Sequence, residues 1–295
     1  MSTRRSLLLA LLVMLLWGSL YPAVKLGYSA YRIQGTADIL LFVGLRFTVC
    51  GGIISLWGLL RYRRAFLPTR STILPILLSG LFAIILHYSL TYSAMLFTDS
   101  SKTALLKQIG VLLYVCFSFL FFKEDRLTPQ KLIGVVLGLC GVLAINIDGG
   151  VLSFGIGEVL VVLASLCTVA SNIVSKKVLQ RVEPLTVTGV SQLFGGLVLL
   201  ILGLAMGGRV ELALNADLWI FVYICLASII SYCIWFSIVK GRELSGLFII
   251  KFAEPIFACA VGALLLHEDI LKPQYLIAFL LISGGICISN LKKKA

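Results

Sequence analysis

Two lysines lie inside apolar stretches of the sequence, where a charged side chain needs an explanation. Lys107 is the only formally charged residue in ALLKQIGVLLYVCFSFLFF (residues 104–122), and Lys251 lies in FIIKFAE. A lysine at the centre of a membrane span costs about 2.5–3.5 kcal/mol on insertion scales. If both ammonium groups approach one anion, they would hold a carboxylate or a phosphate. The alternatives are pairing within the protein or snorkelling to the membrane surface.

Further polar and aromatic residues in apolar stretches are candidates for the same binding site. Tyr114 follows Lys107 by seven residues and lies on the same face of a helix. The other candidates for substrate binding are Tyr21, His87, Tyr88, Tyr92, Asn172, Tyr232 and Trp235. Packing or interfacial anchoring is the alternative for each. His87 titrates near neutral pH in water, so it is also a candidate carrier of a coupling proton.

Four charged residues are assigned to gating or internal pairing: Lys25, Arg46, Glu158 and Glu254. Glu254 lies three residues after Lys251, at a spacing that allows an ion pair on one helix face. Arg46 is expected to be a structural charge with a carbonyl or acid partner. The Glu-Asp pairs at 124–125 and 268–269 are expected to cap the helices that follow them and to pair with Arg126 or Lys272.

The composition excludes a water-soluble protein. The chain has 295 residues, of which 60% are hydrophobic and 13% charged, with a mean hydropathy of +1.06. Soluble domains have about 25% charged residues. The formal charge of +12 has a simpler source than nucleic-acid binding, because loop lysines and arginines orient membrane spans. Nucleic acid is therefore not an expected partner, whereas a lipid bilayer is.

Ten apolar runs are each about the length that crosses a bilayer. They are predicted as helices because lipid-facing backbone must satisfy its own hydrogen bonds. The expected spans are 6–26, 36–60, 72–96, 101–122, 129–147, 155–176, 185–206, 216–239, 245–266 and 273–291. The fold class is therefore all-α and integral to a membrane.

The distribution of basic residues predicts the orientation of these spans. With the N-terminus in the cytoplasm, 17 of the 25 Lys and Arg residues fall in cytoplasmic segments and four in outer segments. Basic residues favour the cytoplasmic side. Both termini are thus predicted to be cytoplasmic, in a plasma (inner) membrane that the chain crosses several times.

The second half of the chain repeats the first at an offset of 144 residues. KEDRLTPQKLIGVVLGLCGVLAI (123–145) and HEDILKPQYLIAFLLISGGICIS (267–289) share nine of 23 positions. The same offset pairs Lys107 with Lys251 and Tyr88 with Tyr232. Each unit, 1–148 and 149–295, holds five predicted spans, so the second unit must run through the membrane in the opposite sense. Inverted repeats are typical of secondary transporters.

The repeated segment, together with WGSLYPAVKLG (17–27), Arg46 and AEPIFACAVGALLLHEDILKPQ (253–274), resembles the paired EamA domains of the drug/metabolite transporter superfamily. The resemblance covers the whole chain. It implies a ten-helix transporter with spans 3, 4, 8 and 9 around a central cavity. Members move amino acids, nucleotide sugars, organic phosphates, amines and other small metabolites. The plastid phosphate translocators of this family are similar in using basic side chains on these helices, which implies an anionic ligand group here.

The resulting hypothesis is a secondary transporter, working as an exporter or exchanger, for a small polar metabolite with a carboxylate or phosphate. Two alternatives stay open. Glu254 and the aromatic residues would hold a cationic amine such as choline, or the chain would be a membrane sensor or scaffold that transports nothing. The sequence shows no nucleophile–base constellation, phosphate loop or metal cluster, so neither an enzyme nor a cofactor is expected. Either a monomer or a homodimer agrees with the sequence.

Overall fold

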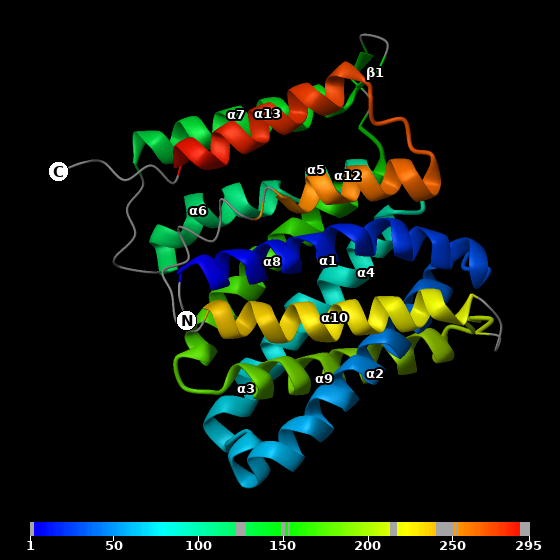
Figure 1. Ribbon diagram of the computed structural model, residues 1–295, viewed down its shortest axis with the longest axis vertical. Coiled ribbons are helices and arrows are strands. Elements are labelled where there is room, and N and C mark those ends of the chain that lie inside the picture. The colour runs from blue at the N-terminus through cyan, green and yellow to red at the C-terminus, as the bar shows by residue number, and fades with distance from the viewer. Residues whose placement is uncertain are drawn as a thin grey trace.

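The computed structural model describes residues 3–121, 128–148, 151–152, 154–212, 217–239, 251 and 253–289 (Figure 1). The first half of the chain contains a series of helices and one short strand. They are α1 (Thr3–Ala30), α2 (Thr36–Tyr62), the 3₁₀ turn η1 (Arg63–Phe66), α3 (Arg70–Gly80), the π-helical η2 (Leu81–Leu86), α4 (His87–Ala94), α5 (Ser100–Leu106), α6 (Ile109–Phe121), α7 (Pro129–Ile145) and β1 (Ile147–Asp148).

The second half begins with a short strand, and its other described elements are helices joined by loops. Its elements are β2 (Val151–Leu152), α8 (Ile156–Leu179), α9 (Pro184–Ala205), α10 (Leu218–Val239), α12 (Ala253–Leu266) and α13 (Pro273–Ser289). Strands β1 and β2 pair antiparallel, with Ile147 opposite Leu152. This two-stranded ladder is a small departure from the all-α expectation, at the join between the two units.

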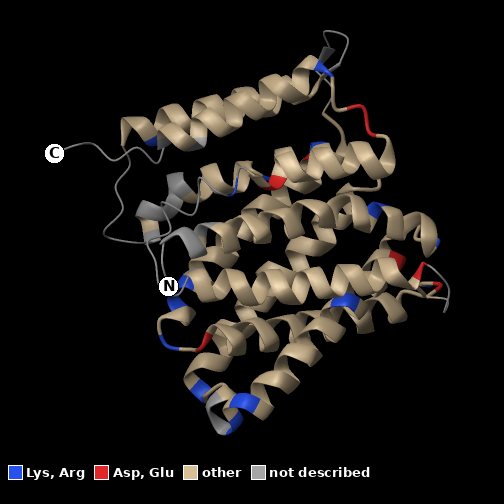
Figure 2. Ribbon diagram, in the orientation of Figure 1, with Lys and Arg blue, Asp and Glu red and all other residues tan. Residues whose placement is uncertain are grey.

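The helices have the lengths and compositions of membrane spans. Within the described residues, six helical stretches are long and apolar enough to cross a membrane, and three shorter apolar helices accompany them. The six are Leu8–Ala30, Thr36–Tyr62, Arg70–Ala94, Ile156–Leu179, Pro184–Ala205 and Leu218–Ile238. Most Lys, Arg, Asp and Glu residues lie toward the ends of helices (Figure 2). The chain is therefore a multi-pass membrane protein.

The predicted span at 101–122 is not one continuous helix. Helix α5 ends at Leu106 and α6 begins at Ile109, so Lys107 and Gln108 lie at a break. The backbone N–H of Gly110 donates to the Lys107 carbonyl at 3.1 Å, an i to i+3 bond instead of the α-helical i to i+4 pattern. The Ser165 hydroxyl on α8 also approaches that carbonyl, at 3.5 Å. Hydropathy predicted one span because the apolar run continues through the break.

The second half has a helix start at the equivalent position. Helix α12 begins at Ala253, which is 144 residues after the start of α6, and the Glu254 N–H donates to the Lys251 carbonyl at 3.1 Å. Each lysine thus precedes its helix by two residues. The part of the predicted span 245–266 that precedes Lys251 lies outside the described residues.

Equivalent helices of the two halves pack against one another. Helix α2 lies along α9, and α7 lies along α13 (Figure 1). The α2–α9 contact is close enough to exclude side chains, because a Cβ at Gly51 would overlap the backbone nitrogen of Leu193, and one at Gly196 that of Thr48. Small residues of this kind let membrane helices approach closely.

Local sequence signals set several helix starts. The Thr128 side chain accepts a hydrogen bond from the Lys131 N–H at 3.4 Å, with Pro129 as the first residue of α7. Proline suits that position because its fixed φ is helical and it lacks an N–H group. At α8 the Glu158 carboxylate accepts from the Gly155 N–H at 2.9 Å, which places negative charge in the first turn.

Candidate functional site

A cavity of about 150 Å³ lies between the two halves of the chain. Helices α1, α2, α4, α6, α8, α10 and α12 and the π-helical η2 contribute to its wall, together with Lys107, Gln108 and Lys251. The lining residues are Trp17, Leu20, Tyr21, Arg46, Ala83, His87, Tyr88, Thr91, Tyr92, Lys107, Gln108, Gly110, Val111, Thr168, Ser171, Asn172, Ser175, Tyr232, Trp235, Phe236, Lys251 and Glu254.

The two lysines enter this cavity from opposite halves of the chain. The Lys107 ammonium lies 5.3 Å from the centre of the Tyr21 ring, and the Lys251 ammonium 5.1 Å from that of Trp235. Aromatic faces attract cations at this distance. The two ammonium groups repel each other electrostatically, and Glu254 attracts both. The two positions that the repeat pairs in the sequence therefore line one cavity.

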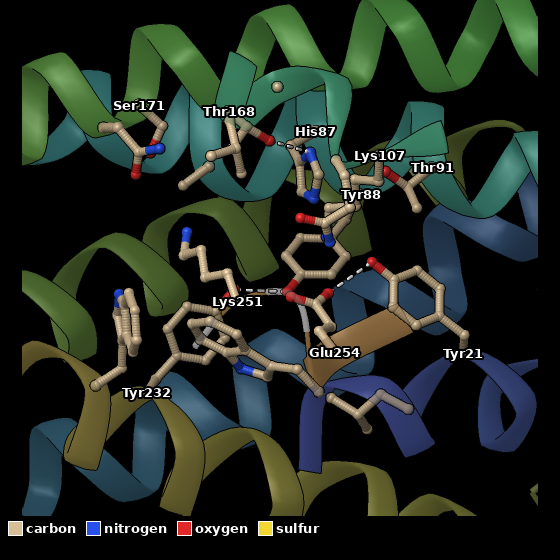
Figure 3. Close-up of a pocket in the computed structure, with 18 of the residues that line it drawn as sticks. Tyr21, His87, Tyr88, Thr91, Lys107, Thr168, Ser171, Tyr232, Lys251 and Glu254 are labelled. Atoms are coloured by element: carbon tan, nitrogen blue, oxygen red, sulfur yellow. Dashed lines mark hydrogen bonds between the residues drawn. The ribbon is translucent and has the colours of Figure 1, made fainter. Parts of the chain in front are cut away.

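Glu254 is a buried carboxylate in the centre of the site. Its Oε1 accepts a hydrogen bond from the Tyr21 hydroxyl at 3.0 Å. Figure 3 shows Glu254 between Lys251 and Tyr21. The sequence left Glu254 open between gating, internal pairing with Lys251 and holding a cationic amine, and the structure puts it in the cavity wall.

A pair of tyrosines joins the halves across the cavity. The hydroxyl groups of Tyr88 on α4 and Tyr232 on α10 are 2.5 Å apart, and these residues are equivalent in the repeat. Tyr92 meets Tyr88 edge-to-face, with ring centres 5.5 Å apart. Trp17 packs against both Tyr232 and Trp235. The aromatic side chains give the cavity a largely apolar wall with a few fixed polar atoms, as is common for small-molecule sites.

His87 is held by α8 (Figure 3). Its Nδ1 lies 3.1 Å from the Ala164 carbonyl and 3.0 Å from the Thr168 hydroxyl. A carbonyl oxygen only accepts, so the hydrogen bond to Ala164 forms in the tautomer whose Nδ1 carries the proton, whereas the Thr168 hydroxyl can bond to either tautomer. The ring is thereby fixed in orientation at the wall of the cavity.

Arg46 is fully buried and lines the same cavity. Its Nε and Nη2 donate to the Ser228 hydroxyl at 3.1 and 2.7 Å. The carbonyl or acid partner expected from the sequence is not found among the described residues, where Ser228 takes that place. The rings of Phe47, Tyr88 and Tyr92 surround the guanidinium, with centres 4.7, 5.3 and 5.7 Å from Cζ.

Tyr114, predicted for substrate binding, and Glu158, predicted for gating or internal pairing, are not among the residues that line the cavity. Tyr114 is buried beside Val169 and Ile173. Glu158 pairs with Lys102 at 2.6 Å. Internal pairing was one of the two roles predicted for Glu158, although the sequence did not indicate Lys102 as its partner. The helical spacing of Tyr114 did not reveal its packing against α8.

Lys25 also lies outside the cavity wall, in a polar cluster at one end of the helix bundle. Its ammonium donates to the Thr98 carbonyl at 2.7 Å and lies 3.5 Å from Asp99 and 4.0 Å from Glu268. Pairing was one of its two predicted roles.

Glu268 was predicted to cap α13 and to pair with Lys272, but its carboxylate caps α5 instead. It accepts hydrogen bonds from the backbone N–H of Ser100 at 2.8 Å and of Ser101 at 3.0 Å, and from both serine hydroxyls. Burial by itself raises the pKa of Glu268, but the hydrogen bonds from Ser101 and Ser100 outweigh it and lower the pKa below its ordinary value. The equivalent acidic pair at 124–125, with its expected partner Arg126, lies outside the described residues.

Several lining residues were not predicted as site residues. Gln108 follows Lys107 directly, and Ser171 and Ser175 flank the predicted Asn172. The signal that could have found the serines is the polar face of their helix, which continues from Thr168 at helical spacing. Gln108 could not be found this way, because the helix breaks there.

Comparison with known proteins assigns the chain to a family. The model of the EamA-like transporter family matches residues 4–147 and again 155–290. The chain is similar to the uncharacterized transporter YvbV of Bacillus subtilis, with 28% identity over 99% of this chain and 93% of that protein. It is also similar to the uncharacterized transporter YoaV of Bacillus subtilis, with 28% identity over 94% of each.

More distant likenesses agree. The uncharacterized inner membrane transporter YedA of Escherichia coli is 20% identical over 93% of this chain and 87% of that protein. A solved crystal structure superposes with a TM-score of 0.68 at 20% identity, covering 97% of this chain and 96% of that one. It shares the fold. Two matches to one family model together cover nearly the whole sequence, and the chain therefore belongs to the EamA-like transporter family.

Proposed function

We propose that the chain is a secondary transporter, working as an exporter or exchanger, whose substrate is a small polar metabolite with a carboxylate or phosphate group. One observation carries the choice of an anion. Lys107, Lys251 and Arg46 line the cavity, and Glu254 is the one carboxylate among the described lining residues. Like charges gathered in a low-dielectric site are costly unless an anion joins them.

The architecture that we propose has ten spans in two inverted five-helix repeats. The equivalent helix starts after Lys107 and Lys251 and the contact of Tyr88 with Tyr232 support a two-fold relation between the halves. A substrate site near the midplane, formed where helices are interrupted, is typical of inverted-repeat transporters. Either side of such a site can open when one half rocks against the other. Both termini would lie in the cytoplasm, because the basic residues gather on that side.

A binding panel on purified protein tests the anion. We would measure thermal stabilisation by glutamate, glucose 6-phosphate, lysine and choline, since a ligand of the folded state raises its stability by mass action. We expect an anion to stabilise the wild-type protein, and we expect this stabilisation to be smaller in the Lys107→Ala and Lys251→Ala variants. Choline stabilisation that survives both substitutions would overturn the anion assignment.

A cationic amine is the second candidate, because the buried Glu254 carboxylate lines the cavity together with aromatic residues, whose rings also attract cations. In that case Lys107 and Lys251 would serve internal contacts. Glu254→Gln would then abolish choline binding, whereas for an anion the same change removes a repulsive charge and leaves or increases affinity.

A measurement of substrate flux distinguishes a transporter from a sensor or scaffold that transports nothing. Protein in sealed proteoliposomes should move the radiolabelled ligand that binds best down its gradient. Binding without any flux, in either orientation of the gradient, would favour the sensor. Proton coupling through His87 is a further part of this proposal, and a transport rate unchanged by a pH gradient would exclude it.

A further inference from the structure

Buried polar atoms without partners point to an additional ligand-binding group in the cavity. Among the described residues, the Nη1 atom of Arg46 is buried and has no hydrogen-bond partner. The indole Nε1 of Trp17, the Thr91 hydroxyl and the Gln108 Oε1 are in the same state, and all four residues line the cavity. Buried polar groups in native proteins nearly always have a partner, so unsatisfied atoms around one cavity indicate that a ligand or water completes them.

Arg46 is the charged member of this set. An arginine remains protonated in proteins, so its charge cannot be removed by losing a proton. It is 0% exposed, and no described carboxylate lies within ion-pair distance of it. A buried charge without a counter-ion costs several kcal/mol on the general scale for protein interiors. An anion that enters the cavity would remove this cost.

The surroundings of the guanidinium determine from which side an anion can approach. The aromatic side chains of Phe47, Tyr88 and Tyr92 pack around it. Ser228 occupies the edge formed by Nε and Nη2. The remaining edge is the one between Nη1 and Nη2, where a guanidinium presents two parallel N–H bonds. This edge matches the two oxygens of a carboxylate.

We propose that Arg46 is the group that anchors the carboxylate of the substrate, through the edge that carries Nη1. Lys107 and Lys251 then supply attraction over the whole cavity, and Arg46 fixes the position of the anionic group. Arg46 also breaks the symmetry of the site. Its equivalent in the second half, 144 residues later, is Val190, so only one half offers this anchor. The substrate is therefore held in one orientation relative to the two halves.

This inference rests on the proposed transport of an anion, and it is tested with benzoate and benzamide. The two probes have nearly the same size and differ in the carboxylate. Binding to purified protein is followed by thermal stabilisation and by the fluorescence of the cavity tryptophans. We expect benzoate to bind and benzamide to bind at least about tenfold more weakly, the effect of losing hydrogen bonds to a charged group.

The deciding variant is Arg46→Gln, with Arg61→Gln as its control at the end of the same helix. Arg46→Gln should weaken benzoate binding by about tenfold or more and leave benzamide binding unchanged, whereas Arg61→Gln should change neither. Ser228→Ala removes the present partner of Arg46 and should retain benzoate binding. A purely structural Arg46 predicts a different result for Arg46→Gln: lower stability with unchanged benzoate affinity.

The outcomes separate this proposal from the proposed function. If Arg46→Gln binds benzoate as the wild-type protein does while Lys107→Ala loses it, the anion site stands and the role of Arg46 is overturned. If the wild-type protein binds glucose 6-phosphate and not benzoate, anion transport stands and the carboxylate anchor is overturned. If Arg46→Gln does not fold, Arg46→Lys decides: it keeps the positive charge without the two parallel donors, and wild-type affinity for benzoate would overturn the proposal.

Discussion

Lys107 and Lys251 occupy equivalent positions in the backbone of the two halves. Each lysine carbonyl accepts a hydrogen bond of 3.1 Å from the backbone N–H three residues later, and each lysine precedes the start of a helix by two residues. Both side chains reach one cavity. In both halves the lysine therefore lies just before a helix start. The two charges line one cavity because the halves face each other.

The lysine pair gives the first prediction. Lys107→Gln and Lys251→Gln should each weaken binding of the anionic substrate, by about tenfold if each loses one hydrogen bond to a charged group. Isothermal titration with the best ligand of the panel measures this. Lys272→Gln, in the loop before α13, is the control and should bind as the wild type. Wild-type affinity in the double variant Lys107→Gln/Lys251→Gln would contradict the prediction.

The tyrosine contact between the halves gives the second. Tyr88→Phe should lower the free energy of unfolding by about 0.5–1.5 kcal/mol, because it removes the hydrogen bond to Tyr232. Tyr232→Phe should cost a similar amount, and the double variant no more than the larger single effect, since both changes remove one bond. Thermal unfolding in detergent measures the cycle, with the exposed Tyr62→Phe as a neutral control. Fully additive costs would mean that the two hydroxyls act separately.

The α2–α9 contact gives the third. Gly51→Ala should destabilise the protein by about 1–3 kcal/mol, the usual cost of overpacking, because the new methyl group overlaps the α9 backbone at Leu193. Gly52→Ala is a matched control one residue away, where a Cβ meets nothing within 4 Å. That change should leave stability unchanged or raise it slightly through helix propensity. The fraction of each variant that remains folded after heating measures the difference. Equal losses of folded protein in the two variants would show that α2 and α9 do not pack this closely.

The carboxylate of Glu268 gives the fourth. Glu268→Gln should lower stability by about 1.5–3 kcal/mol, because the charge-assisted hydrogen bonds from Ser100 and Ser101 are weakened. The next residue, Asp269, is also an acid but is exposed, so Asp269→Asn is the matched control and should have little effect. Thermal unfolding in detergent compares the two variants. Equal stability of both would mean that the Glu268 carboxylate does not hold the start of α5.

The Glu268 carboxylate also predicts that the stability of the protein depends on pH. The pKa of Glu268 is lower in the folded protein than in the unfolded chain. A group of this kind stabilises the fold fully above its unfolded pKa, and the contribution is lost as the pH falls through the folded pKa. Acid should therefore destabilise the wild-type protein more than Glu268→Gln, and the two unfolding curves should converge at low pH. Parallel curves across the acid range would contradict the assignment.

Much of the fold could be read from the sequence. Apolar length and the lack of charge determine that the chain enters a membrane, because lipid permits only backbone that bonds to itself. Eight of the predicted spans match described helices within a few residues, since the spans end where charged residues, glycine and proline begin. The repeat in the sequence pairs Lys107 with Lys251 and Tyr88 with Tyr232, and all four residues line the cavity.

The tertiary structure decided what depends on contacts between distant segments. The break at Lys107 involves no proline, and its carbonyl is met by Ser165 from another helix. Glu268 bonds to serines more than 160 positions away in the chain, and Arg46 finds Ser228 in the other half instead of an acid. Hydropathy depends on each residue's own transfer energy, so it locates spans. Partners of buried charges depend on which helix faces meet, and only the packed fold determines that.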